Sequence, residues 1–180
     1  LDQLMSRGLG DVYKRQAYFL SMQYWLAGSE ENIESLFCYL LSRYSSLHNS
    51  SKVEIKSPVE YPETGLYHPD IPKKITENIS EIPFAKHSIG TVGLLLMRSY
   101  VLSGDTAHYD QVIKSLEALG LKVIPAFAAG LDARPAIDKY FVQNAKASID
   151  TFLSLTGFSL VGGPAYNSSK AAEEALAELD

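Results

Sequence analysis

The sequence lacks the features that mark several large classes of protein. It has one cysteine among 180 residues, so an intramolecular disulfide is excluded. No apolar run approaches the roughly 20 residues that a membrane-spanning helix needs. The first residues also lack the basic start, apolar stretch and small-residue cleavage site of a signal peptide. These absences predict a protein of a reducing compartment, with the cytoplasm as the expected location.

The distribution of charge and histidine excludes two further classes. The net charge is −5 and the basic residues are scattered, so no positive stripe is available to neutralise nucleic-acid phosphates. The four histidines are far apart in the chain. No two of them have the i, i+4 spacing of a helical metal site, and no cysteine pair supports them. We therefore expect no nucleic-acid partner, and no metal or cofactor bound tightly by this chain.

The first 52 residues are predicted to consist of a non-native N-terminal tail followed by helices. Residues 1–16 have no clear period, and 10–16 resemble a translated adapter sequence, so we expect a non-native tail without specific packing. Residues 17–52 are interpreted as a helical segment. Its first helix covers 17–27, and Ser29 can cap a second helix with acidic residues in its first turn. The second helix carries one apolar face at helical period: Ile33, Leu36, Phe37, Leu40, Leu41 and Tyr44.

Residues 53–90 are interpreted as a connector. Five of the eight prolines of the chain fall in this stretch, at positions 58, 62, 69, 72 and 83, and they interrupt regular structure repeatedly. A short strand is expected at Val53–Lys56. Because the stretch is too apolar for a free linker, we expect it to lie against a surface.

Residues 91–180 predict an α/β domain. The continuous apolar run at 91–97 is typical of a strand that is buried on both faces of a sheet, and two further strands are expected at 121–127 and 151–156. Helices are expected between Asp105 and Gly120, over about 135–142, and from Ser168 or Ser169 to Leu179. Alternation of strand and helix predicts parallel βαβ units in a Rossmann-like or flavodoxin-like arrangement that is incomplete at its C-terminal end.

In an open parallel sheet, ligands lie beyond the carboxyl ends of the strands. Three loops are expected at that edge, at 98–105, 128–134 and 157–167. The third has the G-x4-G spacing of a phosphate-binding loop, but Gly163 and Pro164 stand where Lys and Ser or Thr are needed. The sequence therefore argues against an ATP site. The Gly162-Gly163-Pro164 turn fits either a backbone requirement or the close approach of a ligand.

Several long stretches resemble the large-subunit family of magnesium chelatase and cobaltochelatase, over about residues 17–180. They are Gly-Leu-Tyr-His-Pro at 65–69, Thr-Val-Gly-Leu-Leu-Leu-Met-Arg-Ser-Tyr at 91–100, Val-Ile-Pro-Ala-Phe at 123–127, and Ser-Leu-Thr-Gly-Phe-Ser-Leu-Val-Gly-Gly-Pro-Ala-Tyr at 154–166. Members of this family are several-fold longer, so the resemblance implies a fragment. The residues of the last loop favour the magnesium branch. Gly-Leu-Tyr-His-Pro-Asp at 65–70 and Ala-Gly-Leu-Asp-Ala-Arg-Pro at 129–135 are closer to the form found in bacteriochlorophyll synthesis.

The resemblance implies a division of labour. The large subunit binds protoporphyrin IX, Mg²⁺ is a substrate, and ATP is hydrolysed by AAA+ partner subunits. The location would be the cytoplasm, or the plastid stroma in a phototrophic eukaryote. The expected ligand-binding residues are Arg98, Ser99, His108, Asp132, Thr156, Gly157, Phe158, Gly162 and Gly163. Arg98 is expected to pair with a porphyrin propionate. No residue can be assigned as the base. The alternatives are a cobaltochelatase large subunit and a non-catalytic α/β binding domain.

Overall fold

The computed structural model describes residues 2–45, 54–144, 146–162 and 168–179. The chain forms two compact units, one of residues 1–61 with 102–104, and one of residues 62–101 with 105–180. Among the described helices, none is both long enough and apolar enough to cross a membrane.

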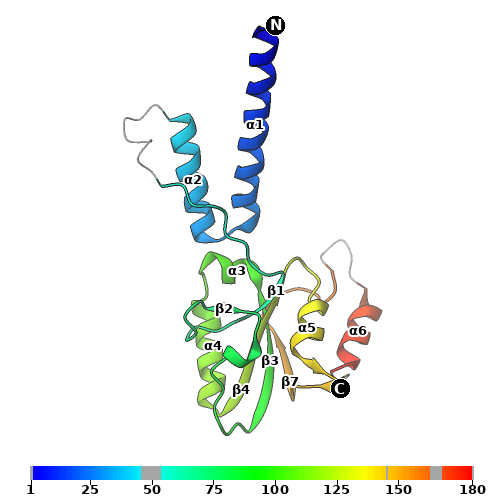
Figure 1. Ribbon diagram of the computed structural model, residues 1–180. Coiled ribbons are helices and arrows are strands. Elements are labelled where there is room, and N and C mark those ends of the chain that lie inside the picture. Colours follow the sequence, from blue (N-terminus) through cyan, green and yellow to red (C-terminus); the bar gives the residue numbers. More distant parts are fainter. Residues whose placement is uncertain (1, 46–53, 145, 163–167, 180) are drawn as a thin grey trace. The chain divides into compact units, whose positions relative to one another are not determined.

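The first unit contains two helices that pack side by side, α1 (Asp2–Ala27) and α2 (Glu30–Tyr44) (Figure 1). Gly28 has φ +65°, a left-handed conformation that favours glycine and ends α1. Ser29 then caps α2 by accepting a hydrogen bond from the backbone N–H of Asn32. Both ends of this turn agree with the sequence-based expectation. Asn32 also ties down the outgoing chain, because its side chain both donates to and accepts from the backbone of Val59.

Two details of this unit differ from expectation. The first helix was expected over 17–27, but α1 also includes residues 2–16; helix formers such as Leu, Met, Lys and Arg and the absence of proline permit this. That residues 1–16 are a non-native tail without specific packing stays a prediction. The expected apolar face of α2 is also divided. Leu36 is buried, whereas Phe37 and Tyr44 are 62% and 67% exposed. This happens because the buried side of α2 is formed by Asn32, Ser35 and Leu36.

The second unit is built on a five-stranded sheet of order β2-β1-β4-β3-β7. Its parallel pairings join β3 (Gly90–Met97) to β4 (Leu121–Ala128) and to β7 (Thr151–Ser154). β3 lies between the other two. The expected strand positions and their parallel direction are therefore confirmed. The order of these strands is that of the flavodoxin-like alternative, in which the third strand pairs with the first rather than with the second.

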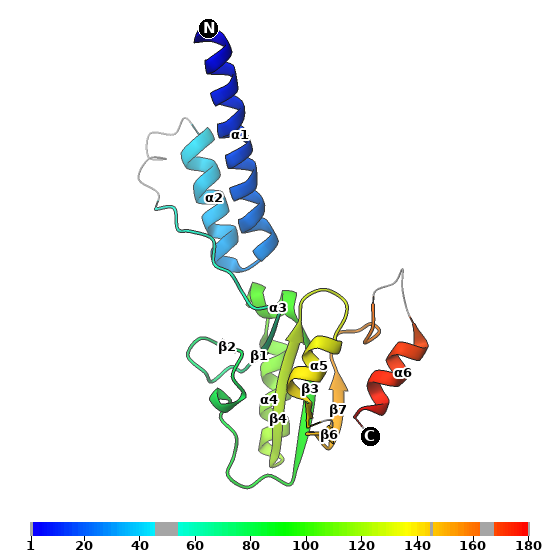
Figure 2. The ribbon, with the colours of Figure 1, turned by 45° about the vertical axis from the view of Figure 1, so that its right-hand side comes forward.

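Helices cover both faces of this sheet (Figure 2). α4 (Ala107–Ala118) packs on one face through Tyr109 and Ile113, which lie in one core with Leu94 and Leu96. α5 (Arg134–Tyr140) packs on the other face, in a second core that contains Leu95. The alternation within β3 follows from the two-residue period of a strand. A helix α6 (Ser169–Ala177), capped by Ser168, ends the described chain as expected.

The predicted connector is part of this sheet, which corrects its interpretation as a separate segment. β1 (Thr64–Tyr67) pairs antiparallel with β4 and also with β2 (Ile75–Thr76). A short 3-10 helix, η2 (Ile79–Glu81), follows. The strand expected at Val53–Lys56 was wrong, since residues 54–56 are irregular and residue 53 lies outside the described residues. Pro62 and Pro69 bracket β1, so the prolines punctuate a strand rather than prevent one.

Three further elements differ from expectation. The chain after β3 enters a helix, α3 (Arg98–Ser103), where a loop was expected. The N-cap position of α4 is Thr106 rather than Asp105, and no side chain caps it. A small antiparallel pair, β5 (Val142–Gln143) with β6 (Lys146–Ala147), follows α5 and was not foreseen. Two-residue strands carry no periodicity that a sequence could reveal.

Candidate functional site

The carboxyl edge of the parallel strands is the candidate functional site. β3 leads into one side of the sheet through α4 and β4, and the chain then crosses to β7 on the other side. The order in which strands are added to the sheet therefore reverses between β3 and β7. Open α/β sheets bind ligands at such a point. Because Leu95 of β3 pairs in parallel with Ser154 of β7, Arg98 and the loop after Ser154 emerge at the same edge.

Arg98 follows β3 and is directed toward the start of β1. Its Nε donates to the carbonyl oxygen of Pro62 at 3.0 Å. Burial lowers the pKa of the guanidinium, while the charge of Glu63 opposes that change; arginine still stays charged at neutral pH. Ser99, the next residue of α3, is exposed. The contact with Pro62 gives Arg98 a role in holding the chain that enters β1.

His108 lies in the first turn of α4, where its ring is exposed and packs against aromatic neighbours. Ring centroids are 5.3 Å apart for Tyr100 and His108, and 3.9 Å apart for His108 and Tyr109. Tyr109 is itself buried, which raises the pKa of its phenol, and its hydroxyl accepts a hydrogen bond from the backbone N–H of Met97. This aromatic group therefore fixes the carboxyl end of β3.

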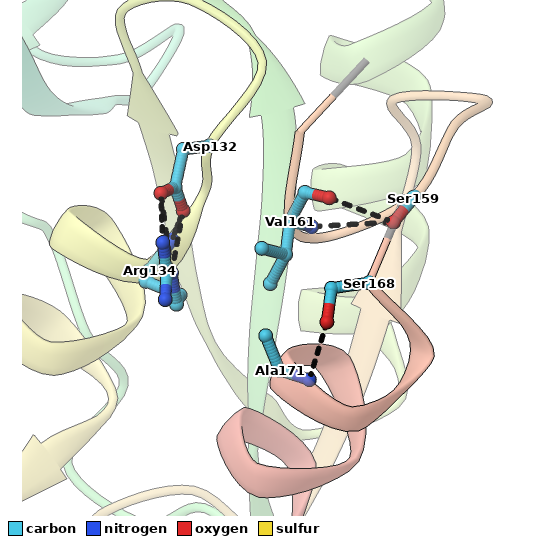
Figure 3. Close-up of polar contacts among 6 residues, drawn as sticks. All are labelled: Asp132, Arg134, Ser159, Val161, Ser168 and Ala171. Atoms are coloured by element: carbon cyan, nitrogen blue, oxygen red, sulfur yellow. Dashed lines mark hydrogen bonds and ion pairs between the residues drawn. The ribbon is translucent and has the colours of Figure 1, made fainter. Parts of the chain in front are cut away.

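Asp132, in the loop after β4, forms an ion pair with Arg134, the first residue of α5 (Figure 3). The Arg134 side chain donates from Nε to both carboxylate oxygens, at 3.0 and 3.1 Å, and from a terminal nitrogen at 2.6 Å. The backbone N–H of Arg134 also donates to Asp132. These hydrogen bonds hold the pKa of Asp132 below its ordinary value. A carboxylate with a lowered pKa is a weak base near neutral pH, so Asp132 is not a suitable proton acceptor there.

The loop after β7 is ordered by its own hydroxyl groups. Thr156 Oγ1 lies 3.0 Å from Ser154 Oγ and donates to the carbonyl oxygen of Phe158. Ser159 Oγ contacts both the N–H and the carbonyl oxygen of Val161 (Figure 3). Val161 is buried. The described part of the loop, up to residue 162, is thus folded, and Val161 packs into the protein.

Two glycines of this loop, Gly157 and Gly162, have a left-handed backbone conformation. Gly157 and Gly162 have φ values of +76° and +82°, a region that other residues seldom adopt. This favours the backbone reading of the two glycines. Gly163 and Pro164 lie outside the described residues, so the expectation for the turn that they form stays a prediction.

The structure brings two of the three expected loops together. The backbone N–H of Ala133 donates to the carbonyl oxygen of Leu160 at 2.9 Å. Asp132 and the 156–162 loop are therefore neighbours, whereas the contacts of Arg98 and His108 lead to β1 and to the aromatic group. Arg134 was not among the expected ligand-binding residues. The signal for its pairing was an acidic residue two positions before an arginine at a helix start, a spacing that lets the arginine fold back on the acid.

The chemistry available at this edge is recognition of ionic and hydroxyl groups. It offers an exposed carboxylate–guanidinium pair and the hydroxyl groups of Thr156 and Ser159. Within residues 2–45, 54–144, 146–162 and 168–179, no three His, Cys, Asp or Glu side chains gather closely enough to hold a metal ion. The fold defines an open-sheet α/β domain, and this edge is where sheets of that kind bind ligands.

Comparison with known proteins gives the family. The CobN/Magnesium Chelatase family model matches residues 22–180, and the chain belongs to this family. It is 54% identical over 171 residues to the magnesium-chelatase subunit designated H from Cereibacter sphaeroides, covering 95% of this chain and 14% of that protein. It is 34% identical over 176 residues to the chloroplastic magnesium-chelatase subunit ChlH of Oryza sativa subsp. indica, covering 91% and 13%. The chain thus spans about one seventh of these relatives.

A solved structure supports the fold. The catalytic subunit of cobaltochelatase from Mycobacterium tuberculosis superimposes with a TM-score of 0.51 at 19% identity, over 77% of this chain and 10% of that one. At this identity the likeness concerns the fold alone. The expected α/β fold and the expected family are both confirmed.

Proposed function

We propose that this chain is a segment of the large subunit of a magnesium chelatase, the subunit that presents protoporphyrin IX for insertion of Mg²⁺. The 54% identity to the Cereibacter sphaeroides subunit over 171 residues carries the proposal. Mg²⁺ would be a substrate of the complete enzyme, and AAA+ partner subunits would hydrolyse the ATP. A cytoplasmic or stromal location stays a prediction, in keeping with the chloroplastic name of the rice relative.

The described residues suit recognition better than chemistry. Metal insertion requires a base that accepts two pyrrole protons and a site that removes water from Mg²⁺, which dehydrates reluctantly. Asp132 is a poor base because its pKa is lowered. We therefore assign the base and the Mg²⁺ site to the part of the subunit that lies outside this segment. The segment by itself should not insert Mg²⁺.

The magnesium branch is preferred over the cobalt branch. The curated relatives at 54% and 34% identity are both magnesium-chelatase subunits, while the cobaltochelatase likeness, at 19% identity, is one of fold. A non-catalytic binding domain of another protein would share the fold but would not explain the sequence identity.

A chimera tests the proposal. Residues 22–180 would replace the matching segment of the Cereibacter sphaeroides subunit, and the product would be assayed with its partner subunits, ATP, Mg²⁺ and protoporphyrin IX. We expect Mg²⁺ insertion within a few-fold of the parent subunit. As a control, the matching cobaltochelatase segment should give an inactive chimera. A folded chimera of this chain that binds the partners yet inserts no Mg²⁺ would refute the proposal.

A further inference from the structure

A second site lies at the opposite edge of the sheet from the candidate functional site. A cavity of about 280 Å³ opens beside Leu121, the first residue of β4, and beside Glu117 near the end of α4. Both positions are at the amino ends of the parallel strands. The residues that line the cavity are His68, Asp70, Pro83, Phe84, Ala85, Glu117, Leu121 and Lys122. His68 belongs to the Gly-Leu-Tyr-His-Pro stretch, which the proposed function leaves without a role.

A buried histidine orients a carboxylate in this cavity. The His68 side chain is fully buried, and its Nδ1 accepts a hydrogen bond from the backbone N–H of Asp70 at 3.2 Å. In the neutral imidazole the other nitrogen, Nε2, then carries the proton. Nε2 lies 3.1 Å from Glu117 Oε1 and donates to it. Glu117 remains 27% exposed, so its carboxylate is both held in place and accessible.

An aromatic ring in the lining of the same cavity already contacts a cation. Lys122 Nζ lies 4.1 Å from the centroid of the Phe84 ring, the geometry of a cation–π contact. Since Nδ1 of His68 accepts a hydrogen bond, the other ionisable groups of the lining are two carboxylates, those of Asp70 and Glu117, and the single ammonium of Lys122. The local charge therefore favours a further positive group.

We propose that this cavity binds a primary ammonium or guanidinium group, with Glu117 as its ionic partner and Phe84 as its aromatic wall. The cavity is at or below the lower limit of small-molecule pockets, roughly 300–1,000 Å³, which suits a single side chain or a small amine. The group comes either from a free amine or from an Arg or Lys of a polypeptide. This inference is independent of the proposed function.

The test is a ¹⁵N NMR titration of the 180-residue chain with agmatine, and separately with an acetyl-Gly-Arg-Gly-amide peptide. We expect saturable shifts of the amides of Phe84, Glu117 and Lys122. If only agmatine binds, the source of the cationic group is a free amine. If the peptide binds more tightly, the source is a polypeptide. No saturable shift with either probe at roughly 10 mM, beyond the range of a millimolar Kd, would overturn the proposal.

Substitutions of the acidic and the basic residue of the cavity should change the Kd in opposite directions. Glu117→Gln keeps an oxygen that accepts from His68 but removes the charge, so the Kd should rise about tenfold. Lys122→Gln removes the like charge and should lower the Kd several-fold. Glu178→Gln, at the exposed end of α6, should change nothing. If Glu117→Gln fails to fold, Asp70→Asn tests the same charge and should also weaken binding. Equal Kd values for all variants would overturn the proposal.

Discussion

The backbone N–H of Ala133 donates to the carbonyl oxygen of Leu160 across 2.9 Å, and this bond joins the loops that follow β4 and β7. These two strands lie on either side of β3 in the sheet. Their loops therefore meet at the carboxyl edge beyond β3. Leu160 packs against the core on the α5 side, so this part of the edge is closed by the protein itself.

Substitution of His68 should be costly. His68→Ala removes a buried ring that joins the end of β1 to α4 through Glu117 and leaves the backbone N–H of Asp70 without its acceptor. We expect a loss of about 2–4 kcal/mol in the free energy of unfolding, measured by urea denaturation. His87→Ala, at an exposed position, is the control and should cost less than about 0.5 kcal/mol. A loss equal to that of the control would show that the His68 contacts contribute nothing.

Gly93→Ala should destabilise the central strand. A Cβ at this position would lie 2.7 Å from Ile149 Cδ1 and 3.2 Å from the Phe141 ring, both in the core on the α5 face. Overpacking of this kind costs about 1–3 kcal/mol, and the midpoint of thermal unfolding reports it. Gly90→Ala, in the same strand, meets nothing closer than 3.4 Å and should be tolerated. Similar losses at both positions would contradict the packing argument.

The Asp132–Arg134 pair predicts a small acid sensitivity. The pKa of Asp132 is lowered in the folded state by the hydrogen bonds from Arg134. The pair therefore stabilises the fold fully above the unfolded pKa of about 3.9, and this contribution disappears as the pH falls through the lower folded pKa. Because both side chains are 40% or more exposed, the effect should be below about 1 kcal/mol. In urea denaturation, the free energy of unfolding of Asp132→Asn should equal that of the wild type at pH 2 and be slightly lower at pH 7. A larger difference at pH 2 than at pH 7 would contradict the predicted sign.

Arg98→Ala should affect stability more than porphyrin affinity. Its Nε donates to the Pro62 carbonyl, and its guanidinium is partly desolvated. Loss of a hydrogen bond from a charged donor costs about 1.5–3 kcal/mol. In the chimeric subunit, porphyrin fluorescence quenching should give a Kd within about twofold of the unmutated chimera, while the unfolding midpoint falls. Ser99→Ala serves as the neighbouring control. A weaker Kd at unchanged stability would instead place Arg98 on the porphyrin.

Removal of residues 1–16 should leave the folded core intact. Residues 12–16 are exposed although they are helical, and among the α1 residues whose burial is described, 12–27, the buried ones are Ala17 and Tyr24, which lie beyond them. We expect a change of less than about 0.5 kcal/mol in the free energy of unfolding. Removal of residues 1–26 is the contrast, because it deletes Tyr24 and should unfold the helical unit. A loss of several kcal/mol on the shorter truncation would show that the tail belongs to the fold.

The sequence alone was enough to predict the alternating strands and helices of residues 91–180 and the family. Apolar runs such as 91–97 and 121–127 predicted buried strands, and Ser29 and Gly120 predicted helix ends, because these signals act within a few residues of chain. Long matching stretches carried the family resemblance in the same local way. What local signals could not provide was the partner of each element.

Only the tertiary structure decided those partnerships. β1 is part of the sheet because the residues after Pro62 pair with β4, and this pairing joins segments more than 50 residues apart in sequence. Arg98 turned to Pro62, and His68 became a buried link to Glu117, 49 positions away. A side chain at a strand end has several possible partners, and the lowest free energy among them depends on which distant segments desolvate it. That is why the sequence predicted the edge where the candidate site lies, while the contacts of its side chains had to come from the fold.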